Sequence, residues 1–301
     1  MKRILVPLDG SPMSESALSP AYFLAGSMGA EVLLLHVVEK SAPDEIHGER
    51  HLTDALSAKA YLDGIVAAAP VSIAVTCHVH DEASPDAAVA IAEHVDELRS
   101  DLVVLATHGR NRFGRFLHGS VAQRAVFRGG VPVLTIPADC GYALSSCGTV
   151  AVATEGAGGH GVPSIEVSTL ARALGACVKL VLVVDERASL KAGAASFARA
   201  RPATAAATLA ATVIAAGEYL HEAALDPAFA GLDVDYRVLR GSPDRALSAY
   251  SKSLGGALFI VQTHGRSGLD AFWDGSAASR IVARLRCPVL LVPSDRIDQV
   301  R

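Results

Sequence analysis

The stretch DLVVLATHGRNRFGRFLHGS, residues 101–120, has a counterpart later in the chain, ALFIVQTHGRSGLDAFWDGS, residues 257–276. In both, an apolar run ends at Thr-His-Gly-Arg, and nine residues separate that glycine from a Gly-Ser pair. A buried strand followed by a glycine-containing loop and a helix is a building unit of parallel α/β sheets. The recurrence predicts that the chain carries this unit twice.

The likeness between the two halves extends along most of the chain. RILVPLDGS at 3–11 matches TVAVATEGA at 149–157, a displacement of 146 residues (149 minus 3). SPDAAVAIAE at 84–93 matches SPDRALSAYS at 242–251, so the displacement grows to 158 residues (242 minus 84). A period of about 150 residues indicates a duplicated domain, because the units of solenoids run to about 20–50 residues.

Each half has the same order of predicted elements. Near-continuous Val and Leu runs without polar alternation, as at 32–38, are typical of strands buried on both faces of a parallel sheet. Helical segments lie between them, one opened by Ser11 as N-cap and a longer one predicted over about 49–68. The alternation of strand and helix predicts two doubly wound α/β domains, residues 1–140 and 148–297.

Composition limits the class of protein. The 301 residues are 50% hydrophobic and 19% charged, as in a globular protein with a sizeable core. The formal net charge of -4 provides no basic surface for nucleic acid. The apolar run in the N-terminal MKRILVPLDGSP is too short for a signal segment or a membrane span, and five cysteines without a CxxC pair suit reduced thiols. We expect a cytoplasmic protein with neither nucleic acid nor a membrane as its main partner.

Three segments are expected to meet at the carboxyl edge of the first sheet, where parallel α/β sheets bind their ligands. They are the end of the first strand at Pro7, Leu8 and Asp9, the end of the second strand at Val37, and the glycine loop. Small residues let backbone amides approach an anion closely, and the helix after the loop aims unpaired N–H groups at a phosphate. Asp9 can accept hydrogen bonds from a ribose or base, or help to hold Mg2+.

The spacing by itself leaves alternatives open. Gly109 and Gly119 can serve a phosphate, or they can close a turn and let a helix pack on the sheet. The loop has neither the Walker Gly-Lys-Ser/Thr nor a GxGxxG pattern. His78 and His80 lie on one face of a predicted strand, which suits a metal pair, but the sequence offers no third ligand, so no metal site is predicted.

With these motifs the chain resembles a tandem member of the universal stress protein family, over residues 1–138 and about 148–296. ATP-binding members carry Gly-x2-Gly-x9-Gly-Ser/Thr after the fourth strand, an Asp at the end of the first and a Val after the His of the second. The resemblance implies two domains of the adenine nucleotide alpha hydrolase-like kind, each a doubly wound, mainly parallel five-stranded sheet. It also implies ATP as the ligand, with Mg2+ left open.

The resemblance assigns roles to individual residues of the first half. Asp9 and Val37, with the backbone of Pro7 and Leu8, would border the adenine and ribose. Ala106 takes the place of the first glycine and adds only a methyl group. The residues implied on the phosphate side are Gly109, Gly119, Ser120 and the Val121 amide, next to Ala106. His108 and Arg110 lie inside the motif and can touch phosphate, but His108 can equally pack under the loop and Arg110 can face water.

The second half departs further from the family pattern. Gln262 takes the place of the first glycine, where its side chain would fill the phosphate space, and Glu155 replaces Asp9 with one methylene more. The first half is therefore the expected nucleotide site and the second its structural copy. The residues implied in the second half are Glu155, Val183, Gly265, Gly275 and Ser276.

The role implied by the resemblance is that of a nucleotide-responsive stress or regulatory protein. No nucleophile with a positioned base is recognisable, so ATP hydrolysis would be slow at most. Two alternatives stay open: an interaction module of the same fold without nucleotide, and a slow ATP hydrolase. In relatives the last strand pairs two domains, so VPVLTIP at 131–137 and CPVLLVP at 287–293 imply pairing of the two halves within the chain and leave a homodimer open.

Overall fold

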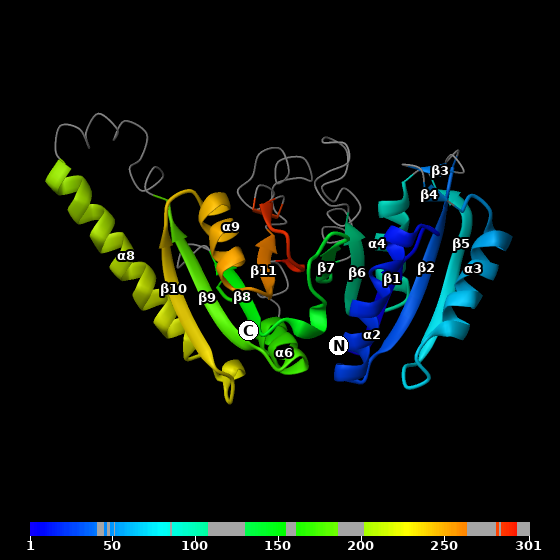
Figure 1. Cartoon of the computed structure of the whole chain (residues 1–301), viewed down its shortest axis with the longest axis horizontal. Helices are drawn as coiled ribbons and strands as arrows, with labels where there is room; N and C mark the ends of the chain where they lie inside the picture. The colour runs from blue at the N-terminus through cyan, green and yellow to red at the C-terminus, as the bar shows by residue number, and fades with distance from the viewer. Residues whose placement is uncertain are drawn as a thin grey trace. The chain divides into compact units, whose positions relative to one another are not determined.

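The computed structural model describes residues 1–40, 45–46, 49–50, 52–84, 86–107, 130–154, 161–185, 202–263, 281–282 and 284–293. Two compact units are present (Figure 1). The first contains Met1–Ser146 together with the strand β12 (Val289–Pro293), and the second lies within Cys147–Leu285.

The first unit alternates strands with helices, as the apolar runs predict. Its described elements are β1 (Arg3–Pro7), α1 (Pro12–Glu15), α2 (Leu18–Met28), β2 (Glu31–Glu39), β3 (Glu45–Ile46), β4 (Glu49–Arg50), α3 (Ala55–Ala68), β5 (Val75–Ser84), α4 (Ala87–Glu97), β6 (Leu102–Thr107), β7 (Val133–Pro137), the 3-10 turn η1 (Leu144–Ser146) and β12.

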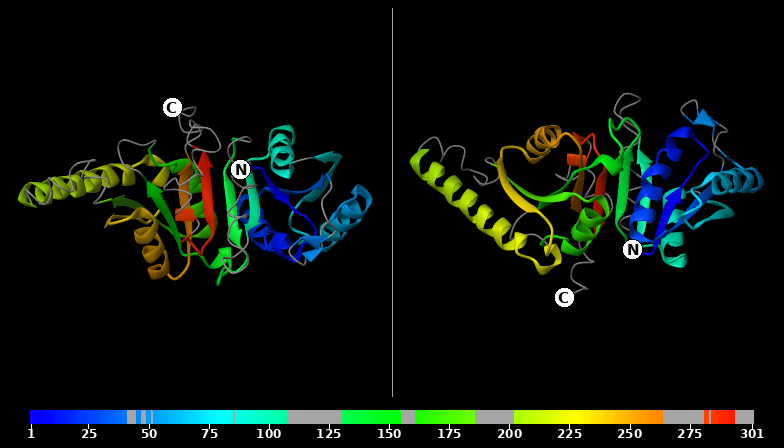
Figure 2. Two further views of the ribbon diagram at one scale, coloured as in Figure 1. Left: turned by 90° about the horizontal axis from the view of Figure 1, so that it is seen from above. Right: turned by 60° about the horizontal axis from the view of Figure 1, so that its bottom comes forward.

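The main sheet of the first unit has the order β12-β7-β6-β1-β2-β5. Strands β7, β6, β1, β2 and β5 run parallel, which confirms the doubly wound, mainly parallel α/β fold. Helices α2 and α3 cover one face of this sheet and α4 covers the other (Figure 2). Because both faces are covered, the central strands bury nearly every residue, and Ile4, Leu5 and Val6 are fully inaccessible to solvent.

The last strand of the second half of the sequence lies in the sheet of the first unit. Strand β12 pairs antiparallel with β7, with Leu290 opposite Leu134. The Thr135 hydroxyl donates a hydrogen bond to the Val289 carbonyl at 3.0 Å. Both strands are apolar and buried, so the pairing covers the edge that β7 would otherwise expose.

The second unit repeats the strand and helix order. Its described strands form a parallel sheet in the order β10-β9-β8-β11. The elements are β8 (Thr149–Thr154), α6 (Ser164–Leu174), β9 (Cys177–Val184), α8 (Pro202–Ala224), the 3-10 turn η2 (Pro227–Phe229), β10 (Val234–Arg240), α9 (Pro243–Ser253) and β11 (Ala257–Thr263).

Helix starts agree with the sequence where a capping side chain is present. Ser11 caps α1 as predicted, since its Oγ accepts a hydrogen bond from the Ser14 amide at 3.1 Å. The helix predicted over 49–68 is wrong at its start: Glu49–Arg50 is a short strand, and α3 begins only at Ala55. Asp54 decides this, because its carboxylate accepts from the Ser57 amide at 2.8 Å and ends the preceding extended backbone.

Candidate functional site

The end of β1 is joined to β2 at the carboxyl edge of the first sheet. Pro7 lies opposite Leu35 in the parallel register, and the Leu8 amide donates to the Leu35 carbonyl at 2.8 Å. Val37 follows two residues further along β2. The register between β1 and β6 places Leu5 opposite Val103, so the two strands end at the same edge. The strands that carry or precede Pro7, Leu8, Asp9, Val37 and Ala106 therefore end at one edge of the sheet.

Asp9 and Gly10 form a tight turn after β1. The Asp9 carboxylate accepts a hydrogen bond from the Ser11 amide at 2.9 Å, and the Asp9 carbonyl accepts one from the Leu52 amide at 3.2 Å. Gly10 has a φ of +91°, which side chains of L-amino acids rarely adopt. The turn is therefore held from both sides, by the start of α1 and by the segment that leads into α3.

The buried His36 side chain lies between the end of β1 and the segment that leads into α3. Its ring is 1% exposed, with Nδ1 2.7 Å from the Leu8 carbonyl and Nε2 3.0 Å from the Leu52 carbonyl. A neutral ring donates one of these two hydrogen bonds, and the imidazolium donates both. We infer that His36 positions the turn at Asp9, although the sequence analysis gave this residue no role.

The predicted contact residues differ in how accessible they are. Leu8 is 3% exposed and Val37 is 7% exposed, so each offers mainly backbone to a molecule at the edge. Asp9 and Ala106 are partly exposed. The other predicted residues lie outside the described part of the chain, apart from Val183 in β9: they are His108, Gly109, Arg110, Gly119, Ser120, Val121, Glu155, Gly265, Gly275 and Ser276.

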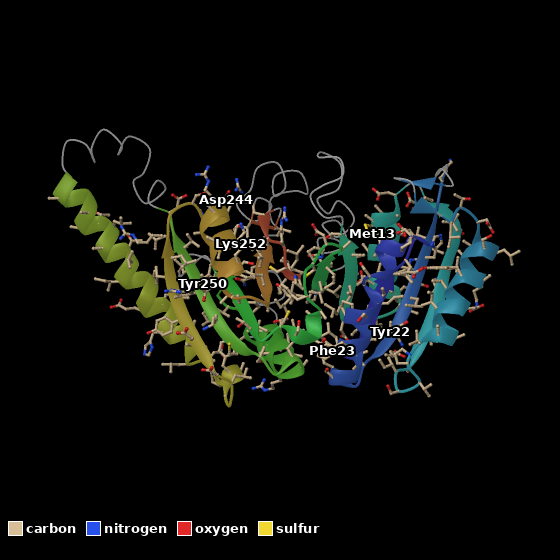
Figure 3. The ribbon with its side chains drawn as sticks, in the orientation of Figure 1. Met13, Tyr22, Phe23, Asp244, Tyr250 and Lys252 are labelled. Atoms are coloured by element: carbon tan, nitrogen blue, oxygen red, sulfur yellow. The ribbon has the colours of Figure 1, made fainter. Side chains whose placement is uncertain are left out.

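A tyrosine from α3 reaches the last residue of α1. The Tyr61 hydroxyl donates to Glu15 Oε1 at 2.9 Å. Burial, the hydrogen bond to Glu15 and the nearby negative charge of Asp9 all raise the pKa of Tyr61 above its ordinary value. Tyr22 on α2 (Figure 3) has a buried hydroxyl with no partner among the described residues, and burial raises the pKa of Tyr22 as well. The face of the sheet that carries α2 and α3 therefore holds phenols that stay neutral.

The second unit has a tyrosine in the equivalent place. Tyr219 of α8 lies 158 residues after Tyr61 (219 minus 61), the same displacement that relates the two Ser-Pro-Asp motifs. Its hydroxyl lies 3.3 Å from Thr154 Oγ1, at the end of β8. The repeat displacement was the signal that could have identified both tyrosines from the sequence.

Gln262 lies near the end of β11, in the position that Ala106 has in β6. Its side chain is 8% exposed, and its Nε2 has no hydrogen-bond partner within the described ranges. A buried amide N–H without an acceptor costs free energy, because the group has lost its hydrogen bonds to water. The second unit therefore holds a larger, polar side chain where the first has a methyl group.

Replacing Gln262 by Met tests this arrangement. Methionine has nearly the same length and no polar hydrogen, so Gln262→Met is expected to raise the free energy of unfolding of the second unit by about 1 kcal/mol. Hydrogen exchange of the β8 and β11 amides measures the change. A fall of more than about 1 kcal/mol would show that the amide has a partner and contradict the expectation.

Neither a cluster of metal ligands nor a membrane-spanning helix is found in the part of the chain that the structure describes. There, no three His, Cys, Asp or Glu side chains are arranged to hold a metal ion. No described helix has the length and apolarity that crossing a bilayer requires. All five cysteines are thiols outside any disulfide.

The chain is a doubly wound α/β protein made of two consecutive units. In the first unit the turn at Asp9 is fixed at the carboxyl edge of the sheet. The universal stress protein family model matches residues 1–137 and 164–293. The chain belongs to the universal stress protein family.

Individual relatives agree with this. Universal stress protein MJ0531 of Methanocaldococcus jannaschii is 29% identical over 140 residues, which are 45% of this chain and 81% of that protein. A solved universal stress protein from Archaeoglobus fulgidus has a TM-score of 0.62 at 18% identity, covering 97% of this chain and 96% of its own. The functionally unknown protein PA1789 from Pseudomonas aeruginosa has a TM-score of 0.63 at 15% identity, covering 100% of this chain and 95% of its own. These two structures have the same fold as this chain.

Proposed function

We propose that the first unit binds an adenine nucleotide, with ATP as the expected ligand, and that the chain acts as a nucleotide-responsive regulatory protein. The observation that carries this proposal is the turn at Asp9, fixed by Ser11, Leu52 and His36 at the carboxyl edge of a parallel sheet. A carboxylate held in one position before the ligand arrives loses little conformational freedom on binding. Asp9 would accept a hydrogen bond from a ribose or base there.

Ala106 supports the same proposal from the neighbouring strand. It is partly exposed, and it lies one residue before the end of β6, ahead of the segment with Gly109 and Gly119. Small residues leave room for a phosphate near the backbone amides. Gln262 takes that room in the second unit, so we propose that the second unit binds nucleotide weakly or not at all.

Calorimetric titration of ATP into the nucleotide-stripped chain, with and without Mg2+, tests the proposal. The wild type and Gly265→Asp are expected to bind one ATP per chain. In Gly109→Asp a new carboxylate would face the phosphates, so binding is expected to weaken by about 100-fold or more. The two variants introduce the same charge at equivalent positions, so each is the matched control of the other.

Two outcomes would contradict the proposal. Equal binding by Gly109→Asp and wild type would move the site away from the first unit. No heat in the wild type, together with a denatured extract free of nucleotide, would leave the interaction module as the better explanation. Phosphate release measured on the same samples separates binding alone from slow ATP hydrolysis.

A further inference from the structure

Three histidines gather between β5 and α4 in the first unit. The ring of His94, on α4, has its centroid 5.0 Å from that of His78 and 4.9 Å from that of His80, both on β5. His94 is 5% exposed, and the other two are partly exposed. The sequence shows the pair on β5, but the third ring comes from an element that begins after it.

Hydrogen bonds fix how the His94 and His78 rings meet. His94 Nδ1 lies 2.8 Å from the Ala90 carbonyl, which can only accept, so this nitrogen carries a proton. His94 Nε2 lies 3.2 Å from His78 Nε2. With one proton already on Nδ1, a neutral His94 accepts at Nε2, and His78 is the donor. If one of the two rings is cationic, one Nε2 still donates and the other accepts. If both are cationic, both Nε2 atoms carry a proton and the hydrogen bond is lost.

The surroundings offer limited compensation for positive charge. Glu97 Oε2 of α4 lies 3.9 Å from His94 Nε2, but the Glu97 side chain is 68% exposed. Asp81 of β5 is the other carboxylate that acts on His78. On the β2 side, Leu35 and Val37 lie opposite His78 and His80 in the register, and both are apolar. Imidazolium rings at His78 and His80, at 5.0 and 4.9 Å from an imidazolium at His94, would therefore be repelled by it strongly in this place.

We propose that His78, His80 and His94 form an acid-sensitive contact that docks α4 on the sheet at neutral pH and loosens it on mild acidification. When α4 is docked, positive charges on these rings are held at centroid distances of 5.0 and 4.9 Å from His94, and they move apart when the helix undocks. Protons therefore favour the undocked helix. The helix is followed by β6, which ends at the proposed nucleotide edge, but the contact does not depend on nucleotide binding.

The pKa of His78 has the direction that this contact requires. Burial is the main cause that lowers it below its ordinary value of 6.5, and the neighbouring His94 lowers it further. A histidine with a lowered folded pKa contributes stability above its unfolded pKa. That contribution is lost as the pH falls from about 6.5 through the lowered value.

Hydrogen exchange of the α4 amides in the full chain, at pH 7.5 and pH 5.5 in EDTA, tests the proposal. The exchange rates are corrected for the intrinsic rate at each pH. Between pH 7.5 and pH 5.5, the protection of the α4 amides is expected to fall several-fold more in the wild type than in His78→Gln. The glutamine amide can donate to His94 or, turned over, accept from it, so it keeps the contact at both pH values. His221→Gln, at an exposed histidine of the second unit, is the matched control and is expected to behave as the wild type.

Three results would overturn the proposal. One is an equal fall in protection in the wild type and in His78→Gln. The second is a 15N NMR spectrum of the wild type at pH 5.5 in which all three imidazole rings are doubly protonated while the α4 amides stay protected. This measurement needs no variant. The third is added Zn2+ at pH 7.5, without EDTA, raising α4 protection in the wild type but not in His78→Gln, which would make the cluster a metal site.

Discussion

His36→Phe is expected to lower the free energy of unfolding of the first unit by about 2 kcal/mol. Phenylalanine keeps the flat ring but has no N–H, so the carbonyl that accepts from a neutral His36 ring, Leu8 at 2.7 Å or Leu52 at 3.0 Å, loses its donor. Each buried acceptor left without a donor costs about 1–3 kcal/mol. The loss is large because the ring is almost fully buried and water cannot replace it.

Hydrogen exchange of the β1 and β2 amides measures this loss in the full chain, because the most protected amides exchange only when their unit opens. His221→Phe is the matched control, since the exposed His221 is expected to tolerate the change within about 0.5 kcal/mol. A loss below about 1 kcal/mol in His36→Phe would mean that the two carbonyls find other donors. It would also remove His36 as the residue that positions Asp9.

Gly10→Ala is expected to destabilise the first unit by about 2–4 kcal/mol. The φ of +91° is itself unfavourable for alanine, at about 1–3 kcal/mol. A Cβ built on Gly10 would lie 2.7 Å from Leu52 Cγ, so the buried leucine would have to move. Overpacking of this kind adds about 1–3 kcal/mol.

Gly29→Ala separates these two causes. Gly29 ends α2 with a φ of +64°, and a Cβ there would meet nothing within 4 Å, so only the backbone cost of about 1 kcal/mol is expected. Adding Leu52→Ala to Gly10→Ala should cost less than the sum of the two single changes, because the contact is removed. Equal losses in Gly10→Ala and Gly29→Ala would contradict the steric argument.

Much of the fold could be predicted because its signals are local. The Val and Leu runs of β1, β2 and β6 predict strands buried on both faces, and Ser11 marks the start of α1. The start of α3 was missed because Asp54 outweighs an otherwise helical composition. Residues after strand ends were assigned to the site by the rule that parallel sheets bind ligands there, and Asp9 and Ala106 lie at that edge.

By itself, the sequence determined the duplication, the order of strands and helices, and the edge of the sheet at which parallel strands end. The tertiary structure alone decided that His36 joins Leu8 to Leu52 and that His94 meets His78. The physical reason is one of range. Side-chain periodicity and capping act over a few residues, whereas these contacts join segments whose approach depends on burying whole strands and helices against each other.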